Sequence, residues 1–375
     1  MGKKVCILSM QRVQNLGSLL QSYALKRMLE EQGCEVHFLD IEARPEDDVL
    51  LHGNTDHYES EMEKSSGFIS KLKKIDRYTV NRLRIRKMAD IQDRYFEEFR
   101  KDLLKITDAD NSQHYDVCVI GSDEVFNCLT PSAWGFTTQL FGNVPQADQV
   151  ITYAASCGAT RFQNLNEETR AEIRSSFLNV SGFSVRDENT REFVDQLTEG
   201  RTIHTHFDPV WCWNFDEEIS KESLPEGLPA KYCIVYSYYN RIHNPEEIQA
   251  IRSFCKERGL TPVAVGAPQM WLKNYSVGSV FQLLKVFQNA AFVITDTFHG
   301  TILSEKLNGR YAVLLRDSNR NKLSDLLKKI HAGEHLISDF TEINRVYGYV
   351  TQRELSSEYQ IQAKQQAMEY LQLKM

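Results

Sequence analysis

The chain has 375 residues, of which 42% are hydrophobic and 25% charged, and it carries a formal net charge of −7. This length favours two domains over one, and the acidic balance argues against a general nucleic-acid binder, whose surface is expected to be basic. The chain does not open with a basic start followed by an apolar run, and it contains no run of about 18 apolar residues. We therefore expect a cytoplasmic protein without a transmembrane helix.

The first elements in chain order form one β-turn-α-β unit. An apolar strand is predicted at Lys4–Ser9, followed by a turn that contains Asn15 and Gly17. Leu19–Gln32 then has apolar residues at helical spacing, and Glu35–Ile41 is a second strand. A unit of this kind predicts a parallel sheet.

Residues 42–111 interrupt this alternation with a polar loop and then a helix predicted from Phe68 to Leu104. Between Lys71 and Lys87 there are eight basic residues against Asp76 alone. Three interpretations remain open: a solvated helix face, a peripheral contact with anionic membrane lipid, or a positive lid near a cleft.

Strands and helices alternate again on both sides of residues 209–229, which we predict to be irregular. Strands are predicted at Tyr115–Gly121, Gln149–Ala155, Gly182–Val185, Tyr232–Tyr236, Thr261–Val265, Ala291–Thr295 and Tyr311–Leu315. Helices are predicted at Asn166–Leu178, Glu188–Leu197, Pro245–Arg258, Val280–Asn289, Gly300–Leu307, Leu323–His331 and Arg353–Leu373.

The pattern predicts an α/β protein of two Rossmann-like domains with a cleft between them. We expect a first domain over residues 1–208, with the helical basic insertion at about 42–111, and a second over residues 209–340. The remaining residues, 341–375, are expected to form a helix that packs back on the first domain.

Three apolar strands lead directly into polar clusters, namely Gly121–Glu124, Arg186–Glu188 and Thr295–Gly300. Ligands of open parallel sheets bind at the carboxyl ends of the strands, where helix N-termini also favour anions. Ionisable groups after three strands therefore predict a binding site at that edge.

His299 is the sharpest candidate, because an imidazole can act as an acid or base near neutral pH. It precedes Gly300, where backbone can approach a ligand closely. Arg186 and Lys322 are candidate anion clamps. The alternatives are a capping or core histidine, and a surface ion pair of Arg186 with Asp187 or Glu188.

Asn15 and Gly17 lie in the first β-to-α turn, a common place for phosphate-binding loops, but the dinucleotide motif G-x-G-x-x-G is absent. His204 and His206 have metal-like spacing, yet alternate positions of a strand explain them equally and no third ligand is evident. The eight cysteines form no C-x-x-C pair and are typical of reduced core thiols. We predict no metal and no cofactor.

A series of short blocks resembles the polysaccharide pyruvyl transferase family. The blocks, in order, are NLGSLLQSYAL (15–25), GSDEVFN (121–127), TYAASCG (152–158), SVRD (184–187), DP (208–209), DTFHG (296–300) and a basic Arg320–Lys322 before a leucine-rich helix. The resemblance covers most of the chain except the insertion.

The resemblance implies a glycosyltransferase-B-like fold and transfer of a pyruvyl group from phosphoenolpyruvate to a sugar. The acceptor would belong to a cell-surface polysaccharide or its lipid-linked oligosaccharide precursor, and the product is a pyruvyl ketal. It also implies donor-site roles for His299, Arg186 and Lys322, and the matching blocks add Asn15, Gly17, Thr297, Gly300 and Arg320 as substrate-binding candidates. Many members carry arginine two residues before the histidine, where this chain has Thr297, so phosphate binding must rest on other groups.

The hypothesis for the chemistry assigns His299 as the general acid, or as the donor to the leaving phosphate, and Asp123 as the base for the acceptor hydroxyl. The alternative for Asp123 is a helix N-cap. Two other functions stay open: a nucleotide-sugar-dependent glycosyltransferase of the same fold, and a non-catalytic partner in exopolysaccharide assembly.

Overall fold

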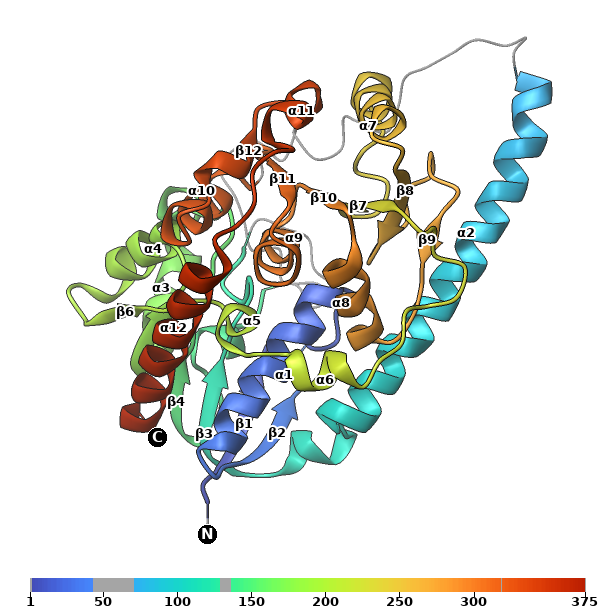
Figure 1. The fold of residues 1–375 in the computed structure, drawn as a ribbon. Helices are drawn as coiled ribbons and strands as arrows, with labels where there is room; N and C mark the ends of the chain where they lie inside the picture. The colour runs from blue at the N-terminus through green and yellow to red at the C-terminus, as the bar shows by residue number, and fades with distance from the viewer. Residues whose placement is uncertain (1, 43–70, 129–135, 318, 375) are drawn as a thin grey trace.

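The computed structural model describes residues 2–42, 71–128, 136–317 and 319–374, and the side chains of residues 71–82 lie outside this description. In the described residues it contains two six-stranded sheets in which all strand pairs are parallel (Figure 1). The predicted α/β class with two Rossmann-like units is therefore confirmed.

The first sheet has the strand order β2-β1-β3-β4-β5-β6. Its strands are β1 (Lys4–Leu8), β2 (Glu35–Leu39), β3 (Tyr115–Ile120), β4 (Ala147–Thr152), β5 (Val180–Val185) and β6 (Ile203–Thr205). Because the direction of strand succession reverses between β1 and β3, their carboxyl ends form the switch point at which such sheets bind ligands.

The second sheet has the strand order β12-β11-β10-β7-β8-β9. Its strands are β7 (Tyr232–Tyr236), β8 (Thr261–Val265), β9 (Tyr275–Ser276), β10 (Phe292–Thr295), β11 (Tyr311–Leu314) and β12 (Leu336–Ile337). Here the switch point lies between β7 and β10. We propose residues 1–208 and 209–340 as the two domains, since the first sheet ends at β6 and the second begins at β7.

The helices follow the predicted alternation. They are α1 (Leu16–Glu31), α2 (Lys71–Phe99), α3 (Glu167–Phe177), α4 (Glu188–Thr198), α5 (Pro209–Cys212), α6 (Asp216–Ser220), α7 (Pro245–Glu257), α8 (Val280–Asn289), α9 (Phe298–Leu303), α10 (Arg320–Lys329), α11 (Ile343–Val346) and α12 (Arg353–Lys374). None of the helices in the described residues is long and apolar enough to cross a membrane.

The prediction of an irregular stretch at 209–229 was wrong for α5 and α6. Asp208 caps α5 by accepting a hydrogen bond from the backbone N–H of Val210 at 3.0 Å, and Pro209 occupies the first helical turn. Proline suits that position because its missing N–H has no partner there anyway. All four residues of α5 are buried, so packing also supports this short helix.

The last helix, α12, contacts the N-terminal half of the molecule (Figure 1). Tyr370 donates a hydrogen bond to the carbonyl oxygen of Thr152 at 3.0 Å, and Gln149 donates one to that of Lys374 at 2.7 Å. Thr152 and Gln149 both belong to β4, so α12 covers one face of the first sheet.

A shared apolar core joins the two halves. One buried cluster contains side chains of β1 and β3 together with those of β7, α8 and β10. At its centre Tyr23 on α1 meets Phe281 on α8 edge to face, with ring centroids 5.3 Å apart. Because buried aromatic pairs contribute strongly to packing, this contact fixes how the two sheets face each other.

The predicted basic helix is present as α2, which ends in a π-helical turn, η1 (Arg100–Leu104). Of the eight basic side chains between Lys71 and Lys87, five fall within residues 71–82 and lie outside the description, while Arg84, Arg86 and Lys87 are exposed. Further along, the Gln92 side chain exchanges hydrogen bonds with the backbone of Gly278 at 3.0 and 3.1 Å. The helix thus connects the N-terminal half to the second sheet.

Candidate active site

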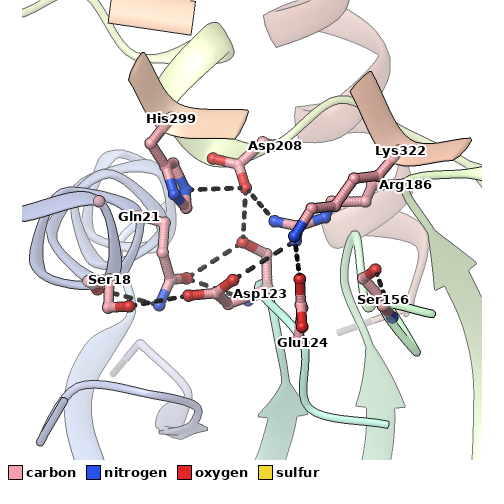
Figure 2. A network of polar contacts seen from close by, with 12 residues as sticks. Ser18, Gln21, Asp123, Glu124, Ser156, Arg186, Asp208, His299 and Lys322 are labelled. Atoms are coloured by element: carbon pink, nitrogen blue, oxygen red, sulfur yellow. Dashed lines mark hydrogen bonds and ion pairs between the residues drawn. The ribbon is translucent and has the colours of Figure 1, made fainter. Parts of the chain in front are cut away.

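Four ionisable side chains meet between the sheets, and we call them the inter-sheet cluster: Asp123, Arg186, Asp208 and His299 (Figure 2). Asp123 follows β3, Arg186 follows β5, Asp208 follows β6, and His299 follows β10. All four strands are parallel, so their carboxyl ends deliver the polar residues that follow them to the same edge.

Asp208 is the centre of this cluster. Its Oδ2 lies 2.9 Å from Arg186 Nη1 and 3.5 Å from His299 Nε2, and its side chain is 0% exposed. Burial alone would raise the pKa of Asp208, but the charges of His299 and Arg186 outweigh it and hold that pKa at about 2. Asp208 therefore stays ionised and can stabilise positive charge on the imidazole.

Arg186 is held by carboxylates on one side and an aromatic ring on the other. Its Nη2 lies 3.4 Å from Asp123 Oδ1, and its Cζ lies 4.2 Å from the ring centroid of Phe298. Burial would lower the pKa of Arg186, yet the carboxylates of Asp123 and Asp208 raise it. Its buried Nε makes no hydrogen bond, which leaves one donor of the guanidinium unused.

The predicted alternative of a surface pair between Arg186 and Asp187 or Glu188 was wrong. Asp187 instead caps α4 and accepts a hydrogen bond from Ser156 Oγ at 2.7 Å. The backbone N–H of Glu188 donates to Asp325 Oδ2 at 2.7 Å.

His299 lies in the first turn of α9, which begins two residues earlier than predicted. A Cβ built on Gly17 would lie 2.2 Å from His299 Nδ1, so only glycine lets the start of α1 approach this imidazole. Asn15 caps α1 by accepting a hydrogen bond from the N–H of Gly17 at 2.8 Å. His299 Nε2 makes no hydrogen bond with any residue that the structure describes.

Asp123 does not begin a helix, so the N-cap alternative is excluded by the backbone. Its φ of 74° lies in the left-handed region that residues other than glycine seldom adopt. Its Oδ2 accepts a hydrogen bond from Ser18 Oγ at 2.9 Å, while Oδ1 faces Arg186. A sparsely populated backbone conformation held by such contacts is typical of functional sites.

Lys322 lies in the first turn of α10 and pairs with Glu124, which follows Asp123 after β3 (Figure 2). Burial would raise the pKa of Glu124, but Lys322 and Arg186 lower it to about 2. The pKa of Lys322 is raised, because Glu124 outweighs the effect of burial. This contact brings a second cation to the edge of the site.

The remaining sequence candidates have structural partners. Thr297 caps α9 through a hydrogen bond from the N–H of Gly300 to its Oγ1 at 3.0 Å. A Cβ on Gly300 would collide with Thr295, Thr297 and Tyr236, so this glycine permits close packing. Arg320 is exposed and pairs with Asp317 at 3.0 Å, apart from the inter-sheet cluster.

Sequence reasoning quoted Asp208 within a block but gave it no role. Asp208 could have been found from its position after a short strand and before a proline. Asp123 and Arg186 were identified in the same way, as polar residues that follow a strand. Lys306 was also missed: its Nζ donates to the carbonyls of Trp211 and Trp213 at 2.6 and 2.9 Å. Burial lowers the pKa of Lys306 to about 7, and the contact ties α5, which Asp208 caps, to the π-helical turn η5 (Ser304–Asn308) that continues α9.

A second set of charges, the one-sheet cluster, surrounds Asp296 in the C-terminal half. Asp296 Oδ2 lies 3.0 Å from Arg316 Nε and 3.6 Å from Arg241 Nε, and Arg316 also forms a two-pronged pair with Glu247 at 2.5 and 3.3 Å. In the described residues no group of three or more side chains is placed to hold a metal ion.

Comparisons with known proteins give low overall similarity to solved structures. A UDP-GlcNAc 2-epimerase of Methanocaldococcus jannaschii, solved with UDP-GlcNAc and UDP, is 10% identical over 96% of this chain and 98% of that one, with a TM-score of 0.45. Arabidopsis thaliana UGT89C1 with UDP is 11% identical over 98% and 95%, with a TM-score of 0.44. The glycosyltransferase SnogD from Streptomyces nogalater is 12% identical over the full length of both chains, with a TM-score of 0.41.

These likenesses say nothing about the reaction of this chain, and no curated protein matches its sequence. The family comparison is specific: the model of polysaccharide pyruvyl transferases matches residues 15–310. That span begins at the cap of α1 and includes every residue of the inter-sheet cluster. The chain belongs to the polysaccharide pyruvyl transferase family.

Proposed function

We propose that this transferase moves a pyruvyl group from phosphoenolpyruvate to a sugar of a cell-surface polysaccharide or its lipid-linked precursor. The observation that carries the proposal is the inter-sheet cluster, where an imidazole with a free Nε2 lies beside a buried arginine and near Lys322. Phosphoenolpyruvate has a carboxylate and a phosphate, so two cations from different elements suit its two anionic ends.

In the proposed reaction, His299 donates the Nε2 proton to the CH₂ carbon of phosphoenolpyruvate, and positive charge develops at C2. Before the proton is transferred, the Asp208 carboxylate stabilises the imidazolium from 3.5 Å away. It does not form a hydrogen bond with Nε2, which leaves the Nε2 proton for the substrate. The alternative role for His299 is to donate its proton to the leaving phosphate, which its position also allows.

A sugar hydroxyl then forms a bond to C2, and Asp123 accepts its proton. Phosphate leaves with the electrons of the C2–O bond, and a second hydroxyl of the sugar attacks C2 to close the ketal. One of the two hydroxyl protons returns to His299, which gave its own proton to the CH₂ carbon. The other hydroxyl proton leaves with phosphate. No further reactant is needed.

The substrate contacts follow from placement. Arg186 would bind one anionic group of the donor through its unused Nε. Lys322 would leave its ion pair with Glu124 and bind the other anionic group. The turn at Asn15 and Gly17 brings the start of α1, a favourable end for an anion, against His299. Thr297 is committed to its cap, so we assign donor binding to Arg186 and Lys322 without the arginine that many family members carry at this position.

The test uses phosphoenolpyruvate labelled with ¹³C at C2 and glycans that carry a free pair of hydroxyl groups. We expect phosphate release together with transfer of the label to a ketal carbon of the glycan, followed by NMR. Phosphate release without label in the glycan, or transfer from a nucleotide sugar in place of phosphoenolpyruvate, would contradict the proposal.

We also propose that α2 contributes a peripheral contact with anionic lipid through the segment Lys71–Lys87. The exposed Arg84, Arg86 and Lys87 support this, since clustered basic side chains attract an anionic surface. Binding to vesicles with and without phosphatidylglycerol tests it, and equal binding to both would contradict it.

A further inference from the structure

The loop that follows β7, residues 237–242, reaches the edge of the second sheet from which His299 projects. β7 and β10 pair in parallel with Tyr236 opposite Thr295, so Ser237 follows beside Asp296. These two strand ends form the switch point of this sheet, where ligands of such folds bind. In the proposed reaction, β10 contributes His299 to this switch point, and no residue that follows β7 has yet been given a role.

This loop is held in one shape by buried hydrogen bonds. The Gln269 side chain donates to the carbonyl of Tyr238 at 2.7 Å and accepts from the N–H of Ile242 at 3.3 Å. Asn240 adopts a left-handed φ of 46°, and its N–H donates to the carbonyl of Pro268 at 3.1 Å. The side chains that this loop exposes are therefore presented on a fixed backbone.

Two adjacent tyrosines are exposed on this fixed loop. Tyr238 is 44% exposed and Tyr239 is 63% exposed. The guanidinium of Arg241 lies over the Tyr238 ring at 5.3 Å, and Arg241 in turn pairs with the buried Asp296. One side of the Tyr238 ring is thus supported by a charge anchored in the one-sheet cluster.

Tyr238 also belongs to the electrostatic surroundings of the candidate active site. The part of Tyr238 that is not exposed is packed against the protein, and this partial burial raises the pKa of its phenol; Lys322 lowers that pKa, and the carboxylates of Glu124 and Asp123 raise it. These are the residues proposed to bind the donor and activate the acceptor. Beside it, the buried Ser237 Oγ makes no hydrogen bond with the described residues, so a hydroxyl donor and acceptor at this strand end has no partner among them.

We propose that Tyr238 is the platform on which the acceptor sugar stacks, with its pyranose ring against the exposed part of the phenol ring. A pyranose has a face of C–H bonds that suits the negative face of an aromatic ring, and a rim of hydroxyl groups that suits Ser237. The cations Arg186 and Lys322 then bind the anionic donor, and the uncharged sugar enters from the C-terminal half. The inference rests on the proposed function, because it names the acceptor subsite of the same site.

The experiment measures affinity for the methyl pyranosides of glucose, galactose, mannose and their N-acetylamino counterparts by saturation-transfer NMR. We expect Tyr238→Ala to weaken binding of the best pyranoside about tenfold, because the stacking face is lost. Tyr238→Phe keeps the ring and is expected within about twofold of wild type. Tyr349→Ala is the matched control, since Tyr349 is 42% exposed and lies on another loop.

Equal affinity of Tyr238→Ala and wild type, an equal loss in Tyr349→Ala, or no pyranoside binding to wild type would overturn the platform. Melting curves with phosphoenolpyruvate on the same proteins separate this result from the proposed function. If phosphoenolpyruvate raises the melting temperature but Tyr238→Ala does not change the affinity for the pyranoside, only the platform is refuted. If Tyr238→Ala weakens pyranoside binding but phosphoenolpyruvate does not raise the melting temperature, only the proposed donor is refuted.

Discussion

The inter-sheet cluster and the one-sheet cluster each pair a buried aspartate with arginine, but they connect different parts of the molecule. In the first, Arg186 and Asp208 of the N-terminal half meet His299 of the C-terminal half. In the second, Arg316 and Asp296 stay within the C-terminal half, joined by Glu247 on α7.

The difference lies in what each cluster leaves available. Arg316 uses both prongs on Glu247 and its Nε on Asp296, a geometry that positions the loop before α9. In the described residues, the one-sheet cluster leaves a carboxylate oxygen, Asp296 Oδ1, without a hydrogen bond, whereas the inter-sheet cluster leaves Arg186 Nε and His299 Nε2, two nitrogen atoms that can donate to an anion. The comparison indicates that the one-sheet cluster supports the site, whereas the inter-sheet cluster is suited to a ligand. The variants below test that distinction.

The largest effect is expected from His299→Gln, which removes the acid but keeps a polar side chain of similar size. Phosphate release with an acceptor that wild type uses should fall by about 10²–10⁴-fold. His204→Gln on β6 is the control, because His204 is exposed and lies outside both clusters. Turnover of His299→Gln near that of His204→Gln would remove His299 from the chemistry.

Replacement of each arginine by methionine compares the clusters directly. Arg186→Met leaves the buried Asp208 and the partly buried Asp123 without the cation that they share, with an expected loss of about 3–5 kcal/mol in the free energy of unfolding. Arg316→Met should cost less, about 1–2 kcal/mol, because Arg241 still faces Asp296 and Arg316 is partly exposed. Urea unfolding measures both, and a larger loss for Arg316→Met would reverse our assignment of roles.

Gly17→Ala probes the contact between the two halves at the imidazole. Its Cβ would meet His299 at 2.2 Å, so the imidazole or the start of α1 must move, at an overpacking cost of about 1–3 kcal/mol. We expect turnover to fall as the imidazole is displaced. Gly333→Ala is the control, since a Cβ there meets no atom within 4 Å; equal behaviour of the two variants in turnover and unfolding would contradict the contact.

The effect with the narrowest range of conditions is on acid stability. Because the pKa of Asp208 is lowered to about 2 in the folded protein, its stabilising contribution is present above about pH 4. It is lost as the pH falls from about 4 to 2, at about 2 kcal/mol for this fully buried group. Asp208→Asn should flatten the fall in unfolding free energy over this interval, and an unchanged slope would contradict the assigned ionisation.

The sequence predicted the sheets well because buried parallel strands are apolar runs with clear ends. It also predicted that residues after β3, β5 and β10 would converge, since parallel strands share one carboxyl edge. It missed α5 and the short strands β6, β9 and β12, whose few residues carry no periodic signal and depend on tertiary packing.

The partners of each side chain were harder to predict than its position. Nothing local distinguishes Arg186, which is 2% exposed and pairs across the chain, from Arg320, which pairs with Asp317 three residues away. Similarly, the role of Gly17 depends on His299 approaching from the other half of the chain. Such contacts arise only when the two sheets are packed together.

The most direct test of the central claim compares melting temperatures with phosphoenolpyruvate and with UDP-glucose, in wild type and in Lys322→Met. A ligand that binds only the folded protein raises its melting temperature. We predict a rise with phosphoenolpyruvate that is reduced in Lys322→Met, and none with UDP-glucose. A rise with UDP-glucose and none with phosphoenolpyruvate would contradict the proposal that the inter-sheet cluster is a pyruvyl-donor site.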